Sequence, residues 1–186
     1  PFMNTVINEL LDPICEVGET EFVSNVCEPY PIPIICELLG APKEDWELFS
    51  RLAEDIFRIF NGNLAEDAPK IMAAQDEMDA YMRSLIAKRR SHPQEDLLTD
   101  LIRAEQDGDR LSTDELLSMA NALLLAGTDT TRNQLACAVS LFAEHPLEFQ
   151  KMQDDLSLAP QAVEETMRYL GAVRGTGRYA SEDIEY

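Results

Sequence analysis

The sequence predicts a mainly α-helical protein with a short β segment near its C-terminal end. Apolar residues recur at steps of three and four through most of the chain, which is the spacing of one helix face. Prolines and glycines stand at the ends of these patterns, where helices begin and end. The last stretch, residues 173–186, instead combines β-type residues with turn formers, so we expect one or two strands there.

The composition is that of an ordinary globular protein. The chain has 186 residues, of which 45% are hydrophobic and 27% are charged, which argues against wholesale disorder. There is no internal repeat and no Ser/Gly linker, so we expect residues 1–186 to form one continuous helical domain. Since the first residue is Pro1 and the last ends an expected strand, we expect both ends to continue into a longer chain.

The charge of the chain excludes several classes of partner. Asp and Glu number 35 against 15 Lys and Arg, which gives a formal net charge of −20. Because such a field repels phosphate backbones and anionic lipids, we expect no nucleic acid and no membrane as a partner. No apolar run has the length of a membrane helix. Four cysteines without paired spacing indicate reduced thiols and a cytoplasmic location.

The first part of the chain predicts a series of amphipathic helices. They lie at residues 1–28, in one piece or two because of Pro13, and then at 30–40, 42–60, 69–90 and 96–106. Pro31 and Pro33 suit the first turn of the second helix, and Gly40 suits its C-terminal cap. Asn61-Gly62-Asn63 and Asp107-Gly108-Asp109 are expected to end the third and the last of them.

The longest predicted helix runs from Ser112 to Glu144. A capping box at Ser112-Thr113-Asp114-Glu115 begins it, and His145-Pro146 ends it. Its length would be on the order of 50 Å, so we expect it to cross the centre of the domain. Two further helices are expected to begin at Pro146 and Pro160, the second running to Gly171.

The middle of the long helix contains poor helix formers, in the segment Ala126-Gly127-Thr128-Asp129-Thr130-Thr131. A glycine in a helix interior costs about 1 kcal/mol relative to alanine. A threonine hydroxyl can also bond a carbonyl one turn back and open the hydrogen-bond ladder. Two interpretations stay open: the gap admits a ligand or a water, or the small residues mark a close crossing of two helices.

Two pairs of side chains are candidates for chemistry or stabilisation. Asp129 next to Thr130 places an acid beside a hydroxyl, and the two could relay protons through water. Glu165 and Arg168 stand three residues apart on a later helix, a spacing that is by itself typical of a surface ion pair. The two histidines share no metal-ligand spacing with any cysteine, so we expect no metal site formed by this chain.

In combination and in this order, the motifs resemble those of the cytochrome P450 superfamily of heme-thiolate monooxygenases. Residues 126–131 resemble the family's central-helix signature, and Glu165-Thr166-Met167-Arg168 resembles its Glu-x-x-Arg motif. Residues 30–42 and 175–183 resemble further segments of soluble bacterial members. The resemblance implies the helical core of the P450 fold, as a partial domain over residues 1–186 that lacks the cysteine loop that binds the heme iron.

The resemblance also implies roles for the residues of the motifs. Ala126 and Gly127 would bind the heme cofactor on the face where oxygen binds, and Arg178 would pair with a heme propionate. Asp129 and Thr130 would be the catalytic pair that delivers protons.

Further residues would shape the pocket and the fold. Leu123, Val173 and Thr176 would line the substrate pocket, with Phe57 and Phe60 as roof contacts. Glu165 and Arg168 would form a structural ion pair that is buried together with a later segment missing from this chain. The cysteines, none of which is expected to be the iron ligand, are Cys15, Cys27, Cys36 and Cys137.

The implied function is insertion of one oxygen atom from O2 into a small apolar organic substrate. The resemblance implies heme b as cofactor, and a ferredoxin with its NAD(P)H-dependent reductase as electron donors. The segment by itself is expected to be inactive. A second hypothesis is a non-catalytic helical module, in which the acidic surface binds a basic partner and the Gly-Thr patch is only a helix crossing.

Overall fold

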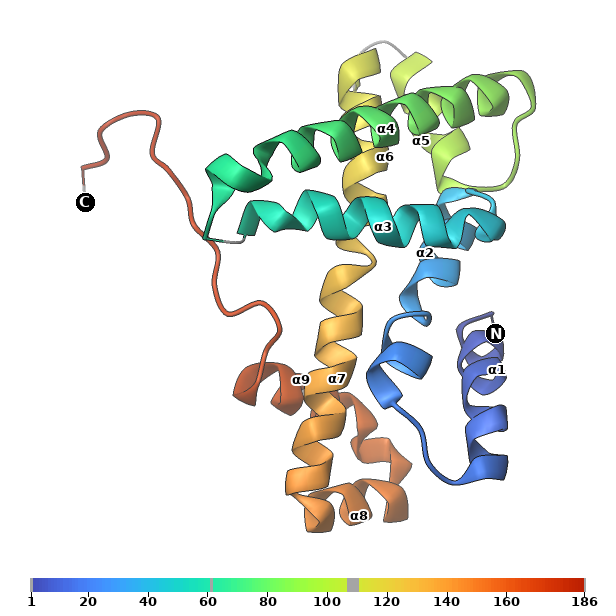
Figure 1. Cartoon of the computed structure of the whole chain (residues 1–186), viewed down its shortest axis with the longest axis vertical. Coiled ribbons are helices and arrows are strands. Elements are labelled where there is room, and N and C mark those ends of the chain that lie inside the picture. The colour runs from blue at the N-terminus through green and yellow to red at the C-terminus, as the bar shows by residue number, and fades with distance from the viewer. Residues whose placement is uncertain (1, 61, 107–110, 186) are drawn as a thin grey trace. The chain divides into compact units, whose positions relative to one another are not determined.

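The computed structural model describes residues 2–60, 62–106 and 111–185 and confirms a mainly helical fold (Figure 1). The chain divides into two compact units, Pro1–Arg132 and Asn133–Tyr186, and the division falls inside one helix. No feature of composition marks that point, which is why the sequence predicted one continuous domain.

The first unit contains most of the expected helices, with shifted ends. Their bounds are α1 Phe2–Val17, α2 Pro31–Leu39, α3 Trp46–Phe57, α4 Leu64–Ser91, α5 Leu97–Gln106 and α6 Thr113–Ala126, with a π-helical turn at Val23–Cys27 and 3₁₀ turns at Lys43–Asp45 and Arg58–Phe60. The helix α1 continues through Pro13 and ends before Gly18, whose φ is +85°. The helix α4 likewise begins before Pro69, so neither proline is a helix boundary. The expected turns at residues 61 and 107–109 lie outside the described residues.

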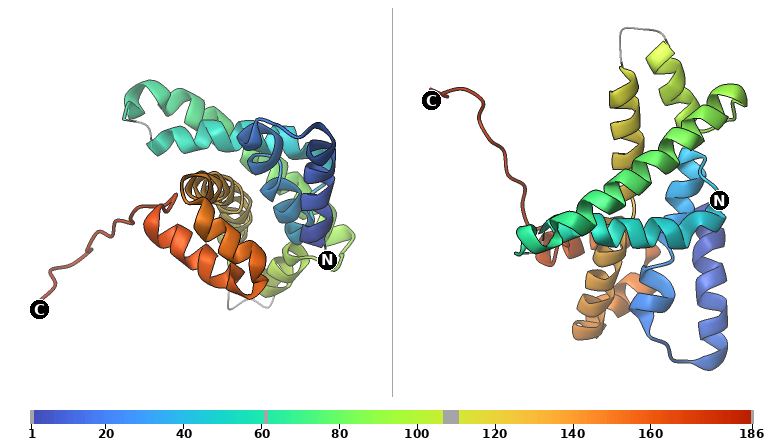
Figure 2. Two further views of the ribbon diagram at one scale, coloured as in Figure 1. Left: turned by 90° about the horizontal axis from the view of Figure 1, so that it is seen from below. Right: turned by 45° about the horizontal axis from the view of Figure 1, so that its top comes forward.

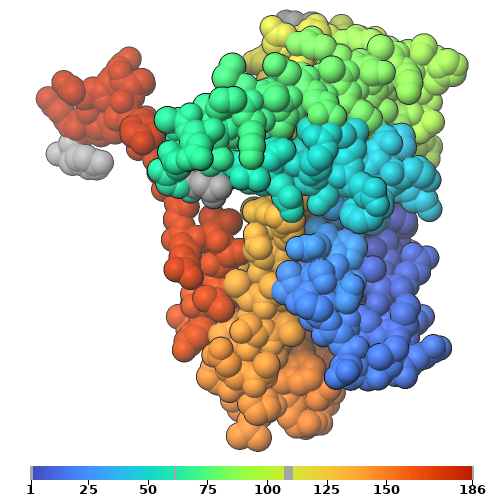
Figure 3. All heavy atoms as spheres, in the orientation of Figure 1, coloured from blue at the N-terminus to red at the C-terminus, as the bar shows by residue number. Residues whose placement is uncertain are grey.

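Apolar faces of these helices form the core of the first unit. The helices α3 and α4 run side by side in all the ribbon views, and α6 packs against α2 and α4 (Figures 1 and 2). Phe49 on α3 is completely buried and meets the edge of the Tyr81 ring on α4 at 5.0 Å between centroids. Figure 3 shows α3 and α4 as one continuous ridge of atoms. The core of the first unit is therefore formed by buried side chains from α2, α3, α4, α5 and α6.

A buried ion pair joins three elements of the first unit. Arg89 near the end of α4 contacts Asp96 at 2.8 Å between Nε and Oδ2, and both side chains are more than nine-tenths buried. The Arg89 guanidinium also donates to the Gly40 carbonyl at 2.6 Å, and Asp96 accepts the Thr99 amide at 2.8 Å as the cap of α5. Gly40 itself has a φ of +82°, and a Cβ there would collide with the Asp96 carboxylate. The ends of α2 and α4 and the start of α5 are thus fixed together.

The predicted long helix is two helices in the structure. The capping box is present, because Ser112 Oγ accepts the Glu115 amide and Glu115 accepts the Ser112 amide. The helix α6 ends at Ala126, however, and α7 (Asp129–Glu144) begins after Gly127 and Thr128. The prediction of one continuous helix was wrong at the point where the sequence is weakest in helix formers. The apolar periodicity continues through residues 126–131, although these residues have low helix propensity, and the periodicity alone therefore predicted no break.

The second unit consists of the greater part of α7, two shorter helices and a tail. The helix α8 spans Pro146–Asp154, a 3₁₀ turn spans Leu156–Leu158, and α9 spans Ala159–Tyr169. Residues 171–185 follow as irregular chain, and no strand is found among the described residues, so the expected β segment is not confirmed. A strand needs a neighbouring strand for its backbone hydrogen bonds. Within the described ranges, no helix is both long and apolar enough to cross a membrane.

We expect Asp96→Ala to destabilise the first unit by roughly 3–5 kcal/mol, because it leaves the buried Arg89 charge without its partner. The matched control is Asp100→Ala, which removes an exposed ion pair with Arg103 on the same helix and should cost less than about 1 kcal/mol. Urea unfolding followed by the fluorescence of Trp46, the single tryptophan of the chain, measures both. Equal losses in the two variants would contradict the structural role of the buried pair.

Candidate functional site

Threonine hydroxyls satisfy the backbone at the break between α6 and α7. The Thr128 hydroxyl donates to the Leu125 carbonyl at 2.9 Å, and the Thr130 hydroxyl donates to the Ala126 carbonyl at 2.8 Å. Carbonyl groups at the end of a helix lose intrahelical donors, and these hydroxyls bind two of them; the Leu125 carbonyl also accepts the Thr128 amide at 3.3 Å. The two threonines thus stabilise the break.

One side of this break is open. Ala126 and Thr130 are exposed, and Leu123 is half-buried, whereas Leu124 and Thr128 are buried at 1% and 4% exposure. A hydroxyl has one proton to donate and lone pairs that accept. Since the proton of Thr130 is used on the Ala126 carbonyl, its oxygen faces the open side as an acceptor.

Asp129 lies next to Thr130 and is held by an arginine one turn later. Arg132 contacts Asp129 Oδ1 at 2.6 Å through Nη2 and at 2.9 Å through Nε, and both side chains are about a quarter exposed. The sequence analysis did not include Arg132 in the site. The signal that could have found it is the i, i+3 spacing of an acid and a base on one helix.

The other side of the break is closed by a second helix. A Cβ on Gly127 would lie 2.8 Å from both Cγ1 and Cδ1 of Ile35 on α2. Of the two interpretations left open for this segment, a ligand in the gap or a close helix crossing, the crossing describes Gly127, because Ile35 occupies the space beside its Cα. A ligand on the open side with Ala126 and Thr130 stays a prediction.

Three expected site residues lie on the tail of the second unit. Val173, Thr176 and Arg178 are all exposed, and the Arg178 guanidinium donates to the Thr176 hydroxyl and to the Gly177 carbonyl. The start of the tail is held by Gln134 on α7, whose side chain accepts the Ala172 amide at 2.9 Å. Pocket and heme roles for these tail residues stay predictions.

Glu165 and Arg168 pair on α9 as their spacing predicts. The two contacts, Nε to Oε2 and Nη2 to Oε1, are each 2.7 Å, so the pair is bidentate. The hydrogen bonds from Arg168 lower the pKa of the Glu165 carboxyl. Both side chains are more than half exposed, so within this chain the pair lies at the surface, and its burial against a later segment, which the resemblance implies, stays a prediction.

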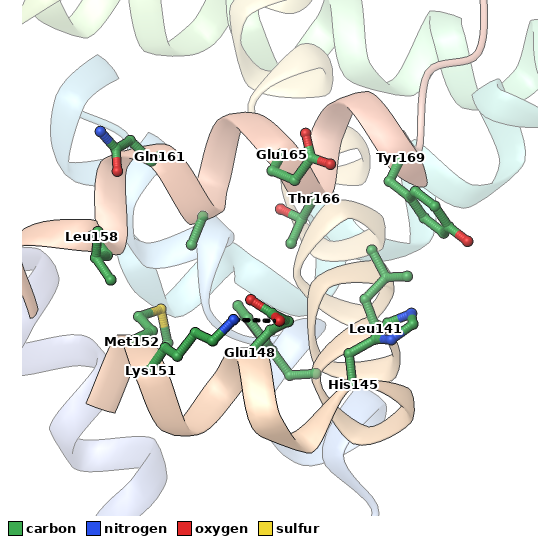
Figure 4. A pocket seen from close by; sticks show the side chains of 12 residues that line it. Leu141, His145, Glu148, Lys151, Met152, Leu158, Gln161, Glu165, Thr166 and Tyr169 are labelled. Carbon is green, nitrogen blue, oxygen red and sulfur yellow. Dashed lines mark hydrogen bonds and ion pairs between the residues drawn. The ribbon is translucent and has the colours of Figure 1, made fainter. Parts of the chain in front are cut away.

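A cavity of about 450 Å³, which no sequence pattern predicted, opens between α7, α8 and α9 (Figure 4). His145 meets the Tyr169 ring edge-on at 6.2 Å between centroids, and Lys151 pairs with Glu148 at 2.7 Å. Leu141 contributes an apolar wall. The cavity reflects the sparse packing of the second unit, where Leu141 and Thr166 are the buried residues among the described positions 133–185.

A helical protein whose central helix breaks at an acid–alcohol pair, followed by a Glu-x-x-Arg helix, has the features of the heme-thiolate proteins. Residues 41–159 match the family profile described as Cytochrome P450. The chain belongs to the cytochrome P450 family.

Similar proteins agree with this assignment. The chain is 38% identical over 171 residues to the "Cyclomarin C epoxidase CymV" of Salinispora arenicola, covering 91% of this chain and 43% of that protein. It is 35% identical to the "6-deoxyerythronolide B hydroxylase" of Saccharopolyspora erythraea, covering 100% of this chain and 45% of that protein. The solved structure of "P450BioI in complex with hexadec-9Z-enoic acid ligated Acyl Carrier Protein" matches with a TM-score of 0.90 and 30% identity, over 100% of this chain and 48% of that one. The chain thus spans about half the length of the relatives that it matches.

The family implies a heme cofactor, and the open side of the break fits one wall of a heme site. That side offers a small side chain, Ala126, and a hydroxyl acceptor, Thr130, and both are exposed. Two cysteines of the first unit, Cys27 and Cys36, do not fit the thiolate ligand, because burial raises the pKa of Cys36 to about 12 and also raises that of Cys27. Among the described residues, no group of three or more His, Cys, Asp or Glu side chains is placed to hold a metal ion.

We expect Glu165→Ala to leave the thermal unfolding of this chain unchanged, because the ion pair is exposed here. In the full-length protein that contains the chain, we expect the same variant, and Arg168→Ala, to give little or no folded heme protein. The comparison of heme absorbance and melting temperature in the two contexts tests whether further sequence buries the pair. A full-length variant with normal heme content and melting temperature would make it an ordinary surface contact.

Proposed function

We propose that this chain is the central part of a heme-dependent monooxygenase that inserts one oxygen atom from O2 into a small apolar organic substrate. The observation that carries the proposal is the open side of the helix break, where the exposed Thr130 hydroxyl lies one turn from Ala126 and beside Asp129. The names of the relatives, an epoxidase and a hydroxylase, support oxygen insertion as the reaction. A ferredoxin and its NAD(P)H-dependent reductase would supply the electrons.

The heme, of the b type, would lie against Ala126 and the backbone at Gly127, and Arg178 would bind a propionate through its guanidinium. Bound there, it would supply oxygen activation, with a thiolate ligand from sequence outside these residues. The open side is suited to this because it presents a small exposed side chain, Ala126, beside the Thr130 hydroxyl. Leu123, with Val173 and Thr176 of the tail, would supply apolar contacts to the substrate.

Thr130 and Asp129 would manage protons at the open side. With its own proton on the Ala126 carbonyl, the Thr130 oxygen would accept a hydrogen bond from a water and hold that water in place. The Asp129 carboxylate lies on the next residue and would pass protons from solvent to that water. Arg132 would hold the carboxylate in one orientation, so proton transfer would require Asp129 to exchange this partner for water.

Phe57 and Phe60 would form the roof of the substrate site. Their rings stack at 6.0 Å between centroids, and Phe60 is 81% exposed. The half-buried Phe57 and the exposed Phe60 give an apolar contact surface at the end of α3. This supports an apolar substrate class.

We expect Thr130→Ala in the full-length protein to retain heme but to form less product for each NAD(P)H consumed, because the water loses its acceptor. The loss in yield should be severalfold, and Thr130→Ser, which keeps the hydroxyl, should restore most of it. The measurement is product against cofactor consumed. An unchanged yield in the alanine variant would remove Thr130 from the reaction.

We expect Asp129→Asn to slow turnover by about tenfold to a hundredfold and to alter the solvent isotope effect, since an amide cannot carry the proton. The control is Asp100→Asn, an exposed carboxylate on α5 far along the sequence from the break. If turnover and isotope effect are both unchanged in Asp129→Asn, Asp129 takes no part in proton delivery.

The isolated 186-residue chain should bind hemin weakly and show no monooxygenase activity. We expect its reduced carbonyl complex to lack the red-shifted Soret band of thiolate ligation, because the buried cysteines of the first unit stay protonated. The difference spectrum of the purified chain is the measurement. A clear thiolate-type band would show that one of the four cysteines reaches the iron.

A further inference from the structure

Gly127 is not required by the conformation of its own backbone. Its φ is −75° and its ψ is −13°, in the right-handed region that any residue adopts. The requirement for glycine comes instead from the space around its Cα. A Cβ there would lie 2.8 Å from Cγ1 and Cδ1 of Ile35 and 3.2 Å from its Cβ, closer than carbon atoms pack.

Ile35 has little freedom to move away. It is 7% exposed and belongs to the core of the first unit. A β-branched side chain on a helix has essentially one χ1 rotamer. The helix that carries it, α2, is held at its C-terminal end, where the Gly40 carbonyl accepts from the buried guanidinium of Arg89.

We propose that Ile35 is a positioning residue for the candidate site. Its side chain packs into the notch at Gly127, fixes the end of α6, and so sets where the break begins. The carbonyls that Thr128 and Thr130 bind, those of Leu125 and Ala126, belong to the two residues directly before Gly127. Ile35 therefore controls the orientation of the Thr130 hydroxyl from the side of the helix opposite to the open face.

The contact predicts that Gly127→Ala changes the melting temperature in opposite directions in the natural sequence and in an Ile35→Ala background. In the natural sequence, Gly127→Ala forces a methyl group against Ile35 and should lower the melting temperature. In an Ile35→Ala background the two 2.8 Å contacts are gone and only the 3.2 Å approach to Cβ remains, which a small shift of the helices relieves. The same substitution then gains helix propensity, so the melting temperature should stay or rise. Ile35→Val removes Cδ1 but leaves Cγ1 at its 2.8 Å approach, so it should rescue Gly127→Ala less well than Ile35→Ala does.

A second measurement separates positioning from general packing. Hydrogen exchange of the full 186-residue chain follows the amides of Gly127, Thr128 and Arg132, which donate to the Leu123, Leu125 and Thr128 carbonyls on either side of the break. We expect Ile35→Ala to accelerate exchange there by about tenfold more than Ile32→Ala does. Ile32 is the matched control, since it is the same residue type on the same helix and is also buried, at 3% exposure.

The role of Ile35 in the reaction rests on the proposed function, whereas its contact with Gly127 does not. In the full-length protein, Ile35→Ala should lower the product formed per NAD(P)H severalfold more than Ile32→Ala. The contact would be supported, and its role in the reaction overturned, if product yield stayed unchanged while two other results appeared. These are the opposite melting-temperature changes of Gly127→Ala in the two backgrounds and the faster amide exchange at the break in Ile35→Ala. Equal exchange in the two isoleucine variants, a harmless Gly127→Ala, or a Gly127→Ala that Ile35→Ala fails to rescue would each overturn the inference itself.

Discussion

The break in the central helix is possible because other hydrogen-bond donors bind the backbone carbonyls at the end of α6. Here the Thr130 hydroxyl binds the Ala126 carbonyl, and the Thr128 hydroxyl joins the Thr128 amide on the Leu125 carbonyl. This arrangement fixes the chemistry of Thr130 as well as the backbone, because a hydroxyl whose proton is used can only accept. It also starts α7 at Asp129, where a carboxylate at a helix N-terminus is favoured by the helix dipole. The orientation of the Thr130 hydroxyl and the position of Asp129 at the start of α7 are thus both linked to the break in the backbone.

Of the two interpretations that the sequence left open for residues 126–131, the structure supports a close helix crossing at Gly127, since Ile35 occupies the place of a Cβ. The side with Ala126 and Thr130 is exposed, and a ligand there stays a proposal. A glycine in such a motif can therefore serve to admit a neighbouring helix. Periodicity along one helix cannot distinguish the two, because the distinction depends on α2.

Local signals predicted the helix ends well where the capping group is close in sequence. Gly40 ends α2 with a positive φ, and Ser112 begins α6 with a capping box, as the residue types indicated. The failures concern tertiary context. The sequence marked residues 126–131 as weak but predicted a continuous helix, because apolar spacing passes through the break. The contact between Arg89 and Gly40 joins residues 49 positions apart and has no local signature. Pairing of the tail into strands likewise depends on a partner that no pattern within residues 173–186 specifies.

The packing of the second unit explains why its site residues were harder to place than those of the first. Its helices expose large apolar side chains, among them Leu147 at 78% and Leu156 at 74%. Helices gain most of their stability by burying an apolar face, and a unit that buries little has few contacts to orient its side chains. Solved relatives match the whole chain over about half of their own length, so their remaining half offers surface for such burial. The roles of Val173, Thr176 and Arg178 depend on contacts of that kind, whereas Thr130 and Asp129 are oriented by bonds within their own segment.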